Sequence, residues 1–426
     1  MARATGSYRV LRRNTLGLLA TPVLLLVTCL TGPASAAQYG GGAGTAESPF
    51  LIYTVQDFLL IGNSPADWDK QFKLMRDIDL AGYDETKLRP IGRWVTLGGT
   101  ENKPFAGKFD GNSKTIANFK YEDVQQEYVA LFPYVAGTIA HVKLRRATVI
   151  GNASAAGSLV GYLEHGGVED CSVTDAYVSG NLNVGGLIGW ADGPVIKCYA
   201  YGRVSGKQYV GGLAGGLDQG PLAQCYAKVD VVGNHSVGGL LGVAFSNASI
   251  IDACYATGSV DGNQYVGGLI GQIVGGSAHQ SYSTGRVTGK LDVGGFTGST
   301  RMFGEVLGCL WDTETSKQAT SPGSVGKTTA QMKSLDTFVS AGWSFTVWTI
   351  CDGLNYPVLL WQIPRGDLVC PDGVTWLDFA WFAQNWRHSD CTAANFSCEG
   401  ADLDASGAVG HLDLMILAQN WLAGTN

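Results

Sequence analysis

A short motif recurs six times at a nearly constant interval between Ala156 and Gly298, and it limits the possible folds more than any other sequence feature. The first glycines of successive copies are 28, 26, 27, 29 and 27 residues apart. A unit of this length cannot enclose a core alone, so neighbouring units must stack to bury their apolar residues. The copies read Ala156-Gly-Ser-Leu-Val-Gly161, Val184-Gly-Gly-Leu-Ile-Gly189, Val210-Gly-Gly-Leu-Ala-Gly215, Val237-Gly-Gly-Leu-Leu-Gly242, Val266-Gly-Gly-Leu-Ile-Gly271 and Val293-Gly-Gly-Phe-Thr-Gly298.

The residues between these motifs alternate in character with a period of two. From Cys198 to Val204 the alternate positions are small and apolar, whereas the positions between them carry larger or polar side chains such as Tyr199 and Arg203. This alternation predicts a strand with one buried face. We therefore expect two or three short strands in each unit and no helix.

Glycines are expected to shape the turns of each unit. Gly206 and its equivalents precede an asparagine or lysine in most copies, which predicts a turn with positive φ at the glycine. Val184 and Leu187 are three residues apart, so both can be buried only if the chain bends at the two glycines between them.

Coiling the chain, one turn per unit, would place equivalent residues about 4.8 Å apart on parallel strands and close the core. A propeller is disfavoured, because its blades need about 40–50 residues. The sequence thus predicts an all-β fold, a parallel right-handed β-helix or solenoid with capping elements. The repeats resemble the GLUG family, named for the Gly-Leu-(any)-Gly core, over residues 105–311, with Ala130-Leu-Phe-Pro-Tyr134 as a degenerate earlier copy. This resemblance implies a bacterial surface or secreted protein whose repeats are not catalytic.

The flanking segments are predicted to cap the solenoid, residues 37–104 at its start and residues 312–363 at its end. A strand is expected at Phe50–Tyr53, followed by a short helix that begins at a capping box formed by Thr54 and Asp57. At the other end, aromatic residues from Trp343 to Trp361 are expected to cover the last turn.

Composition changes after Pro364, and the loop before the last predicted helix has the spacing of a calcium loop. Counted from Asp402, oxygen-bearing side chains fall at positions 1, 3, 5 and 12, with Gly407 at position 6. An EF-hand loop needs this pattern, because Ca²⁺ takes hard oxygen ligands and the chain turns sharply at the glycine. The alternative is an acidic turn without a metal. The predicted calcium ligands are Asp402, Asp404, Ser406, the carbonyl of Ala408, and Asp413.

A weaker calcium loop is predicted earlier in the same module from Asp367, Asp372 and Asp378. Val369 stands where a ligand is expected, and the stretch from Gly373 to Asp378 is one residue shorter than its counterpart. The sequence therefore leaves open whether this first loop binds an ion.

Two helical segments follow these loops at an offset of 35 residues, Leu377–Trp386 and Leu412–Trp421. Loops and helices together resemble a diverged type I dockerin over about residues 366–424, so residues 364–426 form a predicted small α-helical domain with paired EF-hand loops. The resemblance implies Ca²⁺ as cofactor and a cohesin-like protein domain as partner. Cys370, Cys391 and Cys398 lie outside the dockerin pattern; a disulfide around the inter-helix loop is expected, with its pairing open.

Two columns of identical residues are expected to stack along the solenoid. Cys171, Cys198, Cys225 and Cys254 predict a buried column of free thiols, since stacked residues on parallel strands seldom have disulfide geometry. The neighbouring tyrosines predict a column of rings that either stack on each other to protect the surface or offer a platform for a sugar. This tyrosine ladder consists of Tyr199, Tyr226, Tyr255 and Tyr282.

The sequence contains neither G-x-S-x-G nor H-E-x-x-H, and the acidic residues of the repeats occupy different repeat positions. We therefore expect a non-catalytic binding or adhesion protein, for which a polysaccharide is a further candidate partner. The alternative is a carbohydrate-active β-helix enzyme, of polysaccharide lyase or glycoside hydrolase type, carried by its dockerin. It would need a cleft with two carboxylates, or a carboxylate with a basic group, about 5–10 Å apart.

A segment before the regular repeats is denser in charged residues and is interpreted as a solvated insertion. These residues are Arg89, Arg93, Lys108, Asp110, Lys114, Glu122 and Asp123.

The first residues predict a signal peptide rather than a membrane-spanning helix. Arg9, Arg12 and Arg13 form a positive stretch before a short apolar run from Leu16 to Leu30. Ala34-Ser-Ala36 matches a cleavage site, so residues 1–36 would be removed. Removal takes away four arginines and no acid, and 25 basic minus 36 acidic residues leaves a charge of −11. Such an acidic chain disfavours nucleic acid as a partner. We expect a secreted or cell-surface protein.

Overall fold

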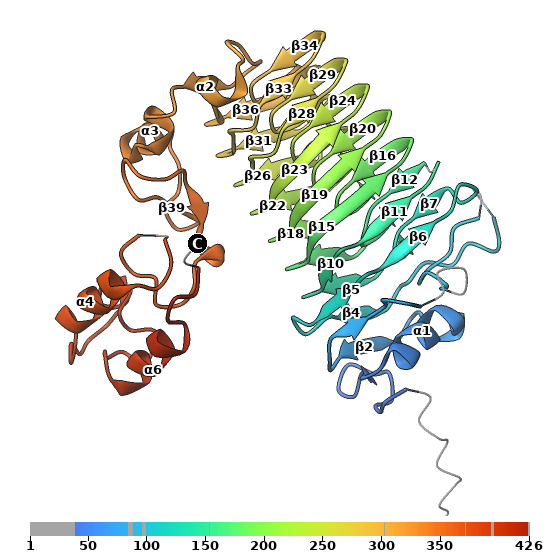
Figure 1. Cartoon of the computed structure of the whole chain (residues 1–426), viewed down its shortest axis with the longest axis horizontal. Coiled ribbons are helices and arrows are strands. Elements are labelled where there is room, and N and C mark those ends of the chain that lie inside the picture. The colour runs from blue at the N-terminus through green and yellow to red at the C-terminus, as the bar shows by residue number, and fades with distance from the viewer. Residues whose placement is uncertain are drawn as a thin grey trace, which may run out of the picture. The chain divides into compact units, whose positions relative to one another are not determined.

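The computed structural model describes residues 39–83, 88–95, 99–152, 154–301, 303–370, 372–392 and 396–424. The predicted signal peptide and its cleavage site lie outside these residues. Four parallel sheets run along a β-solenoid (Figure 1), as the repeat pattern predicted. The two shorter sheets hold seven strands each, one from each of seven consecutive turns.

Sheets 1 and 2 extend along the whole solenoid. Sheet 1 contains, in spatial order, β1 (Phe50–Ile52), β2 (Gln71–Leu74), β4 (Lys108–Asp110), β9 (Thr138–Ala140), β14 (Gly167–Glu169), β18 (Val195–Ile196), β22 (Gly220–Ala223), β26 (Ser249–Asp252), β31 (Ser277–His279) and β36 (Glu305–Leu307). Sheet 2 contains β3 (Ile78–Asp79), β5 (Thr115–Ala117), β10 (Lys143–Arg145), β15 (Ser172–Ser179), β19 (Tyr199–Ser205), β23 (Tyr226–Val232), β27 (Tyr255–Ala256), β32 (Tyr282–Ser283), β37 (Leu310–Asp312) and β38 (Val325–Lys327), with β6 (Lys120–Glu122), β11 (Thr148–Ile150), β28 (Val260–Asp261) and β33 (Val287–Thr288) alongside.

Sheets 3 and 4 lie on either side of the glycine-rich motif. Sheet 3 contains β7 (Tyr128–Val129), β12 (Ala155–Ala156), β16 (Leu182–Gly185), β20 (Gln208–Gly211), β24 (His235–Gly238), β29 (Gln264–Gly267) and β34 (Leu291–Gly294). Sheet 4 contains β8 (Phe132–Val135), β13 (Val160–Leu163), β17 (Ile188–Ala191), β21 (Ala214–Leu217), β25 (Leu241–Ala244), β30 (Ile270–Ile273) and β35 (Thr297–Thr300). A regular turn therefore has four strands, not the two or three expected, because the glycine motif divides one predicted strand into two.

The bend at the glycines buries both apolar residues of the motif. Val184 lies one residue before the end of β16, Leu187 immediately precedes β17, and both side chains are fully buried. The motif leucines then stack from turn to turn, since the Leu187 N–H donates to the Leu213 carbonyl at 3.0 Å and the Leu213 N–H to the Leu240 carbonyl at 2.9 Å. Leu187, Leu213, Leu240 and Leu269 are all completely buried, as the solenoid requires.

The expected positive φ at Gly206 and its equivalents is wrong. Gly206 lies outside the left-handed region, whereas Tyr209, three residues later, has φ 55°. The glycine is needed for close packing instead, because a Cβ at Gly206 would lie 2.8 Å from a methyl carbon of Val184 and 2.9 Å from one of Val210. Val184 and Val210 belong to a column of valines that stack in register along sheet 3, namely Val184, Val210, Val237, Val266 and Val293. The side chains of this valine column occupy the space that a larger residue would need.

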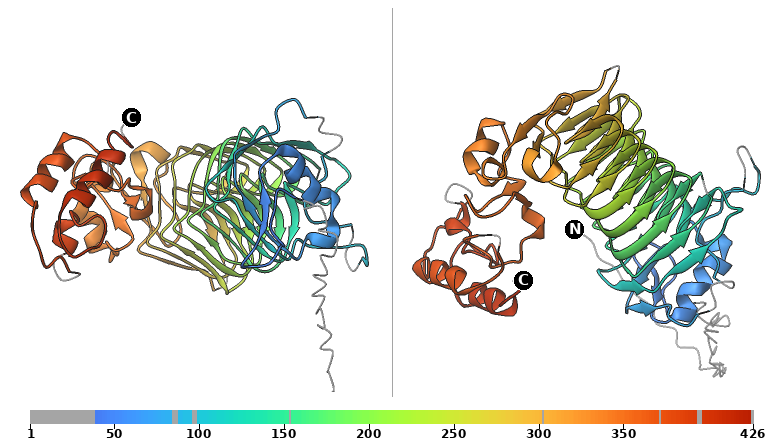
Figure 2. Two further views of the ribbon diagram at one scale, coloured as in Figure 1. Left: turned by 90° about the horizontal axis from the view of Figure 1, so that it is seen from below. Right: turned by 45° about the horizontal axis from the view of Figure 1, so that its top comes forward.

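Helices lie outside the solenoid strands. In Figure 2, α1 lies at the start of the solenoid, where Thr54 and Asp57 form the predicted capping box. The segment before residue 105 is more than a cap, because it contributes β1, β2 and β3 to sheets 1 and 2. The helices are α1 (Val55–Asn63), α2 (Thr313–Ser316), α3 (Leu335–Ser340), α4 (Trp376–Gln384), α5 (Phe396–Glu399) and α6 (His411–Gln419), with 3-10 turns at Pro65–Asp67, Gln331–Lys333 and Leu360–Gln362.

The aromatic segment after the last turn covers the side of the solenoid rather than only its end. This segment contains the antiparallel pair β39 (Trp348–Thr349) and β40 (Val358–Leu359). The Trp348 ring lies 6.1 Å from that of Tyr255 and 5.8 Å from that of Tyr282, while Trp361 lies 5.8 Å from Tyr226. The cover therefore spans several turns of the tyrosine ladder.

Candidate metal centres and other functional residues

The second acidic loop brings three carboxylates together immediately before α6. Carboxylate oxygens of Asp402, Asp404 and Asp413 lie within 4.8 Å of one another, and Asp402 and Asp413 are buried. The backbone holds them in place: Gly407 N–H donates to Asp402 at 3.0 Å, and Asp404 N–H donates to Asp413 at 2.9 Å. The three predicted carboxylate ligands of this loop are thus gathered at one point.

The remaining predicted ligands of this loop also lie together. The Ser406 hydroxyl donates to the Ala408 carbonyl at 3.1 Å, so these two oxygens are neighbours. Gly407 has φ 89°, a conformation that favours glycine, and this explains why the loop needs glycine at that position. The hydrogen bond from Ser406 lowers the pKa of Asp404, so this carboxylate is ionised at neutral pH.

The first acidic loop gathers its carboxylates as closely as the second. Asp367, Asp372 and Asp378 also have carboxylate oxygens within 4.8 Å of one another. Asp378 is fully buried and accepts the N–H groups of Leu368 at 2.6 Å and Val369 at 3.0 Å. Val369 therefore contributes its backbone to the loop although its side chain is no ligand.

Asp367 carries the clearest sign of a missing partner. Its Oδ1 is buried without a hydrogen-bond partner among the described residues, while Oδ2 accepts the Gly373 N–H at 3.0 Å. Burial raises the pKa of Asp367 to about 6; the Gly373 hydrogen bond opposes this rise, and the charges of Asp378 and Asp372 add to it. A cation at this point would relieve both the lost hydration and the repulsion.

The two loops support each other across the module. Val374 exchanges backbone hydrogen bonds with the chain after α6, donating to the Ala423 carbonyl and accepting from Leu422, both at 3.0 Å. Val409, 35 residues later, does the same with the chain after α4, donating to His388 at 2.9 Å and accepting from Arg387 at 3.1 Å. Each loop is thus bonded to the chain after the other loop's helix. Sequence analysis did not predict these matching bonds, although the repeat at an offset of 35 residues is the signal from which they could have been inferred.

The donor set of both loops fits a divalent cation with oxygen ligands, as Ca²⁺ prefers. Each holds three carboxylates, and in the ranges that the structure describes none of the six forms an ion pair with a Lys, Arg or His side chain. If an ion binds, Asp367, Asp372 and Asp378 would hold it in the first loop. Asp402, Asp404, Ser406, the Ala408 carbonyl and Asp413 would hold it in the second.

Both helices of the module leave apolar side chains exposed at equivalent positions. Leu377 in α4 is 62% exposed, and Leu412, its counterpart in α6, is 50% exposed. Phe382 and Leu417, again 35 residues apart, are the buried anchors of the two helices. Trp376, Phe379 and Met415 add to the exposed apolar surface. The exposed apolar side chains, with one equivalent pair at Leu377 and Leu412, make the two helices a candidate interaction surface.

Two disulfides stabilise this part of the chain. Cys391 pairs with Cys398 around the loop between the helices, which agrees with the expected position of one bridge. Cys351 pairs with Cys370 and joins the aromatic cover to the first acidic loop.

The tyrosine ladder exists, but three of its four rings are covered by the chain itself. Successive rings stack at 4.9, 4.9 and 5.1 Å with interplanar angles of 6° or less. Tyr282 is only 1% exposed, and Tyr226 and Tyr255 are also buried, because residues 343–362 cover them. The Tyr282 hydroxyl donates to the Pro357 carbonyl at 2.7 Å, and Gln362 donates to the Tyr255 hydroxyl at 2.8 Å. The ligand-stacking interpretation is therefore wrong for these three rings, and the ladder binds the chain's own aromatic segment.

The predicted cysteine column consists of buried free thiols that also bond to the backbone. Cys198 N–H donates to the Cys225 sulfur at 3.3 Å, and that sulfur donates to the Ala223 carbonyl at 3.2 Å. Ser281 takes the same position in a later turn, accepting the Cys254 N–H at 2.9 Å and donating to His279 at 2.6 Å. The column thus satisfies polar backbone groups at the corner between sheets 1 and 2, a role that hydrophobicity alone did not predict.

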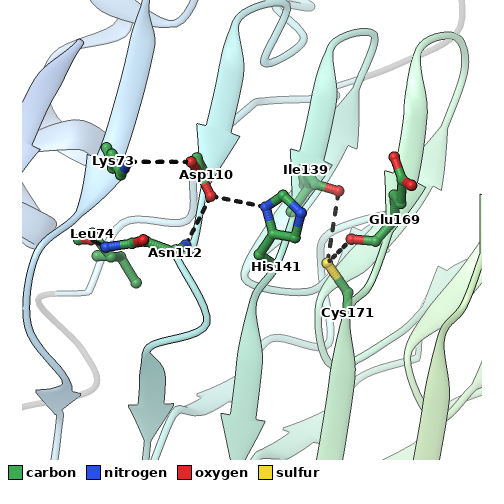
Figure 3. Close-up of polar contacts among 8 residues, drawn as sticks. All are labelled: Lys73, Leu74, Asp110, Asn112, Ile139, His141, Glu169 and Cys171. Atoms are coloured by element: carbon green, nitrogen blue, oxygen red, sulfur yellow. Dashed lines mark hydrogen bonds and ion pairs between the residues drawn. The ribbon is translucent and has the colours of Figure 1, made fainter. Parts of the chain in front are cut away.

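One polar cluster meets part of the requirement for catalysis. Figure 3 shows Asp110 between His141 and Lys73, with its carboxylate 3.0 Å from His141 Nδ1 and 4.0 Å from Lys73 Nζ. Burial acts to raise the pKa of Asp110, but hydrogen bonds from Asn112 and His141 and the charges of His141 and Lys73 outweigh it, so the pKa lies below its usual value. Asp110, His141 and Lys73 line neither of the two clefts that surround Trp94 and Tyr162.

Comparisons with known proteins give two partial sequence relatives. The chain is 30% identical over 174 residues to "Halomucin" of Haloquadratum walsbyi, which is 41% of this chain and 2% of that protein. It is 31% identical over 147 residues to a "Putative Gly-rich membrane protein" of Evansella cellulosilytica, which is 33% of this chain and 16% of that protein. The chain thus spans a small fraction of the length of both relatives. No family model matches it.

A solved structure supports the fold. The crystal structure of a "putative immunoglobulin A1 protease" from Bacteroides ovatus is similar with a TM-score of 0.50 and 22% identity, over 76% of this chain and 96% of that one. At this identity the likeness concerns the fold alone. Among the described residues, no helix is both long and apolar enough to cross a membrane.

Proposed function

We propose that this chain is a secreted or cell-surface binding protein, whose β-solenoid is attached to a cohesin-like partner through a calcium-dependent, dockerin-like module. The observation that carries the proposal is the pair of carboxylate clusters, each before one of two equivalent helices. The unpartnered Asp367 oxygen supports a cation in the loop whose sequence fits less well.

Calcium would act on the helices through the last carboxylate of each loop. Asp378 and Asp413 lie in the first turns of α4 and α6, where each also accepts a backbone N–H, from Thr375 and from Gly410, both at 2.7 Å. An ion bound to these residues would tie each loop to its helix and cancel the repulsion among the carboxylates. Without the ion, the loops and the exposed faces around Leu377 and Leu412 would lose their fixed positions.

Three features support the cell-surface location. The leader pattern, the excess of acidic residues and the printed name of the glycine-rich membrane protein all favour an exported protein. The GLUG-like repeats agree with this location. A binding role is proposed rather than catalysis, because the sequence lacks the G-x-S-x-G and H-E-x-x-H motifs and the Asp110 cluster lines neither of the clefts around Trp94 and Tyr162.

Surface plasmon resonance against a panel of purified cohesin domains tests the proposal. The protein should bind at least one cohesin in excess calcium and release it in EDTA. The double substitution Leu377→Ser and Leu412→Ser should abolish binding, whereas Leu354→Ser, at a leucine that is 69% exposed outside the module, should leave it unchanged. Absence of binding to every cohesin, or binding that EDTA does not affect, would contradict the proposal.

A further inference from the structure

Two adjoining clefts lie beside the first turns of the solenoid, away from the tyrosine ladder. The larger has a volume of about 680 Å³ and the smaller about 250 Å³, and Tyr128 lines both. Tyr162 and Trp190 line the smaller cleft, and Trp94 lines the larger. Pockets with several aromatic side chains and a few fixed polar groups are typical ligand sites.

Three aromatic residues at or beside the clefts belong to one column of sheet 4. Tyr134, Tyr162 and Trp190 are paired in register on β8, β13 and β17. The same column continues as Gly216, Val243 and Gln272, so it is aromatic only in the first three turns. Stacking of the repeats does not require aromatic residues at this position, since later turns do without them. The aromatic residues of the first three turns are therefore a local feature of the clefts.

The rings are held as a group. Tyr134 and Tyr162 are parallel to within 1° at 5.9 Å, and the Trp94 ring meets Tyr134 edge-on at 5.1 Å. Tyr128 approaches Tyr162 at 5.2 Å. Trp190 lies over Gly216 of the next turn, where a Cβ would overlap its ring. The missing side chain at Gly216 therefore allows the indole to lie flat on the sheet.

Carboxylates fix the polar edges of these rings. Asp192 accepts the Tyr162 hydroxyl and the Trp190 Nε1–H, both at 2.6 Å. Glu164 accepts the Tyr134 hydroxyl at 2.5 Å, and Glu127 accepts the Trp94 Nε1–H at 2.7 Å. Each carboxylate retains lone pairs for further donors.

Asn183 adds an acceptor that no described residue uses. Its Nδ2 donates to the Ser154 carbonyl at 2.7 Å, which directs Oδ1 away from that carbonyl. This Oδ1 is buried without a hydrogen-bond partner among the described residues, and Asn183 lines the smaller cleft. A ligand hydroxyl would satisfy it.

From this combination we infer that the two clefts bind a polysaccharide built of neutral sugars. A pyranose presents C–H groups on its faces and hydroxyls around its edge. The negative faces of aromatic rings attract the C–H groups, and the acceptors beside Tyr162 and Trp190 match the hydroxyls. Acidic sugars fit less well, because three negative charges, on Glu127, Glu164 and Asp192, lie beside the aromatic rings. Of the two arginines that line the larger cleft, Arg93 already pairs with Glu101 at 3.1 Å, so only Arg89 would be left to oppose these charges.

This site goes beyond the attachment proposed above and does not depend on it. The clefts lie on the solenoid, and no calcium-loop residue lines them. Binding of the saccharide should therefore be the same in calcium and in EDTA, unlike binding of a cohesin.

Isothermal titration calorimetry of the whole protein with cellohexaose, xylohexaose, mannohexaose and a galacturonate hexamer tests the inference. At least one neutral hexasaccharide should bind, and more tightly than the galacturonate hexamer. Trp190→Ala and Tyr162→Ala should each weaken binding about tenfold or more, since each removes a ring face for the sugar C–H groups and a donor that holds Asp192 in place. Tyr177→Ala is the matched control, because this exposed tyrosine lies on sheet 2.

Gly216→Ala provides a test that removes no ring. Its added methyl group must displace the Trp190 indole, so binding should weaken while the circular dichroism spectrum and melting temperature stay close to those of the parent. The inference is overturned if no neutral hexasaccharide binds, if the galacturonate hexamer binds best, or if all three cleft variants bind like the Tyr177→Ala control.

Discussion

Substitutions of Cys225 distinguish two explanations for the cysteine column. If the column only fills space, a small apolar residue should replace the thiol without loss. In the structure, however, the Cys225 sulfur accepts the Cys198 N–H at 3.3 Å and donates to the Ala223 carbonyl at 3.2 Å. Burial raises the pKa of the Cys225 thiol, so it remains a neutral donor at physiological pH. We therefore expect hydrogen bonding to decide which residues are tolerated.

The magnitudes follow from which bonds each variant keeps. Cys225→Val fills the space but leaves the buried Cys198 N–H without an acceptor, which costs about 1–3 kcal/mol of unfolding free energy. Cys225→Ala adds a small cavity, for a total of about 2–4 kcal/mol. Cys225→Ser keeps both bonds, as Ser281 does naturally, so its cost should stay below about 1 kcal/mol.

Urea unfolding followed by far-ultraviolet circular dichroism measures these differences. Amide hydrogen exchange adds a local measurement, because only the Val and Ala variants should lose protection at the Cys198 N–H. The reasoning is refuted if Cys225→Val is as stable as the parent and Cys225→Ser is the least stable of the three.

Three further predictions concern other parts of the chain. Trp348→Ala should destabilise the protein by about 3–5 kcal/mol and expose the tyrosine ladder to protease, because the ring is fully buried against Tyr255 and Tyr282; unchanged melting and proteolysis would contradict this. Gly206→Ala should lower the melting temperature, because its methyl group would clash with Val184 and Val210. Gly353→Ala, at a positive φ with nothing within 4 Å, should lower the melting temperature only through backbone strain. If Gly206→Ala lowers the melting temperature no more than Gly353→Ala does, the valine side chains move aside freely and the packing argument is wrong. Asp110 has a folded-state pKa below its unfolded value, so its stabilising contribution is present above the unfolded pKa near 4 and is lost as pH falls through the folded pKa. Asp110→Asn should therefore reduce the acid sensitivity of unfolding in that range, and an unaltered pH profile would argue against the His141 contact.

The repeat pattern alone predicts most of the solenoid. A period near 27 residues and the alternation after Cys198 require stacked parallel strands, and the burial of Leu187 and its equivalents follows directly. The expected strand count and the expected role of Gly206 are wrong, because a glycine in a repeat signals either positive φ or close packing and the sequence does not distinguish them.

Contacts between distant segments could not be predicted from local patterns. Tyr255 bonds to Gln362, 107 residues away, so nothing near the tyrosine ladder in the sequence shows that it is covered. The clefts could not be predicted for the same reason. Trp94 lies in sequence before the repeats, yet its ring contacts Tyr134 and Tyr162 from later turns. The acidic loops were predictable because their ligands are close in sequence. Val369 stands at a ligand position of the first loop and made that loop look weaker, yet Asp367, Asp372 and Asp378 come together as closely as the acids of the second loop.

Calorimetric titration of calcium into the metal-free protein tests the central claim, that both acidic loops bind calcium, most directly. The account predicts about two ions per chain, since each loop forms one site. Asp402→Ala and Asp378→Asn should each reduce this to about one, and the double variant should give no specific heat. A parent protein that releases no heat with calcium, or a stoichiometry that neither substitution changes, would contradict the account.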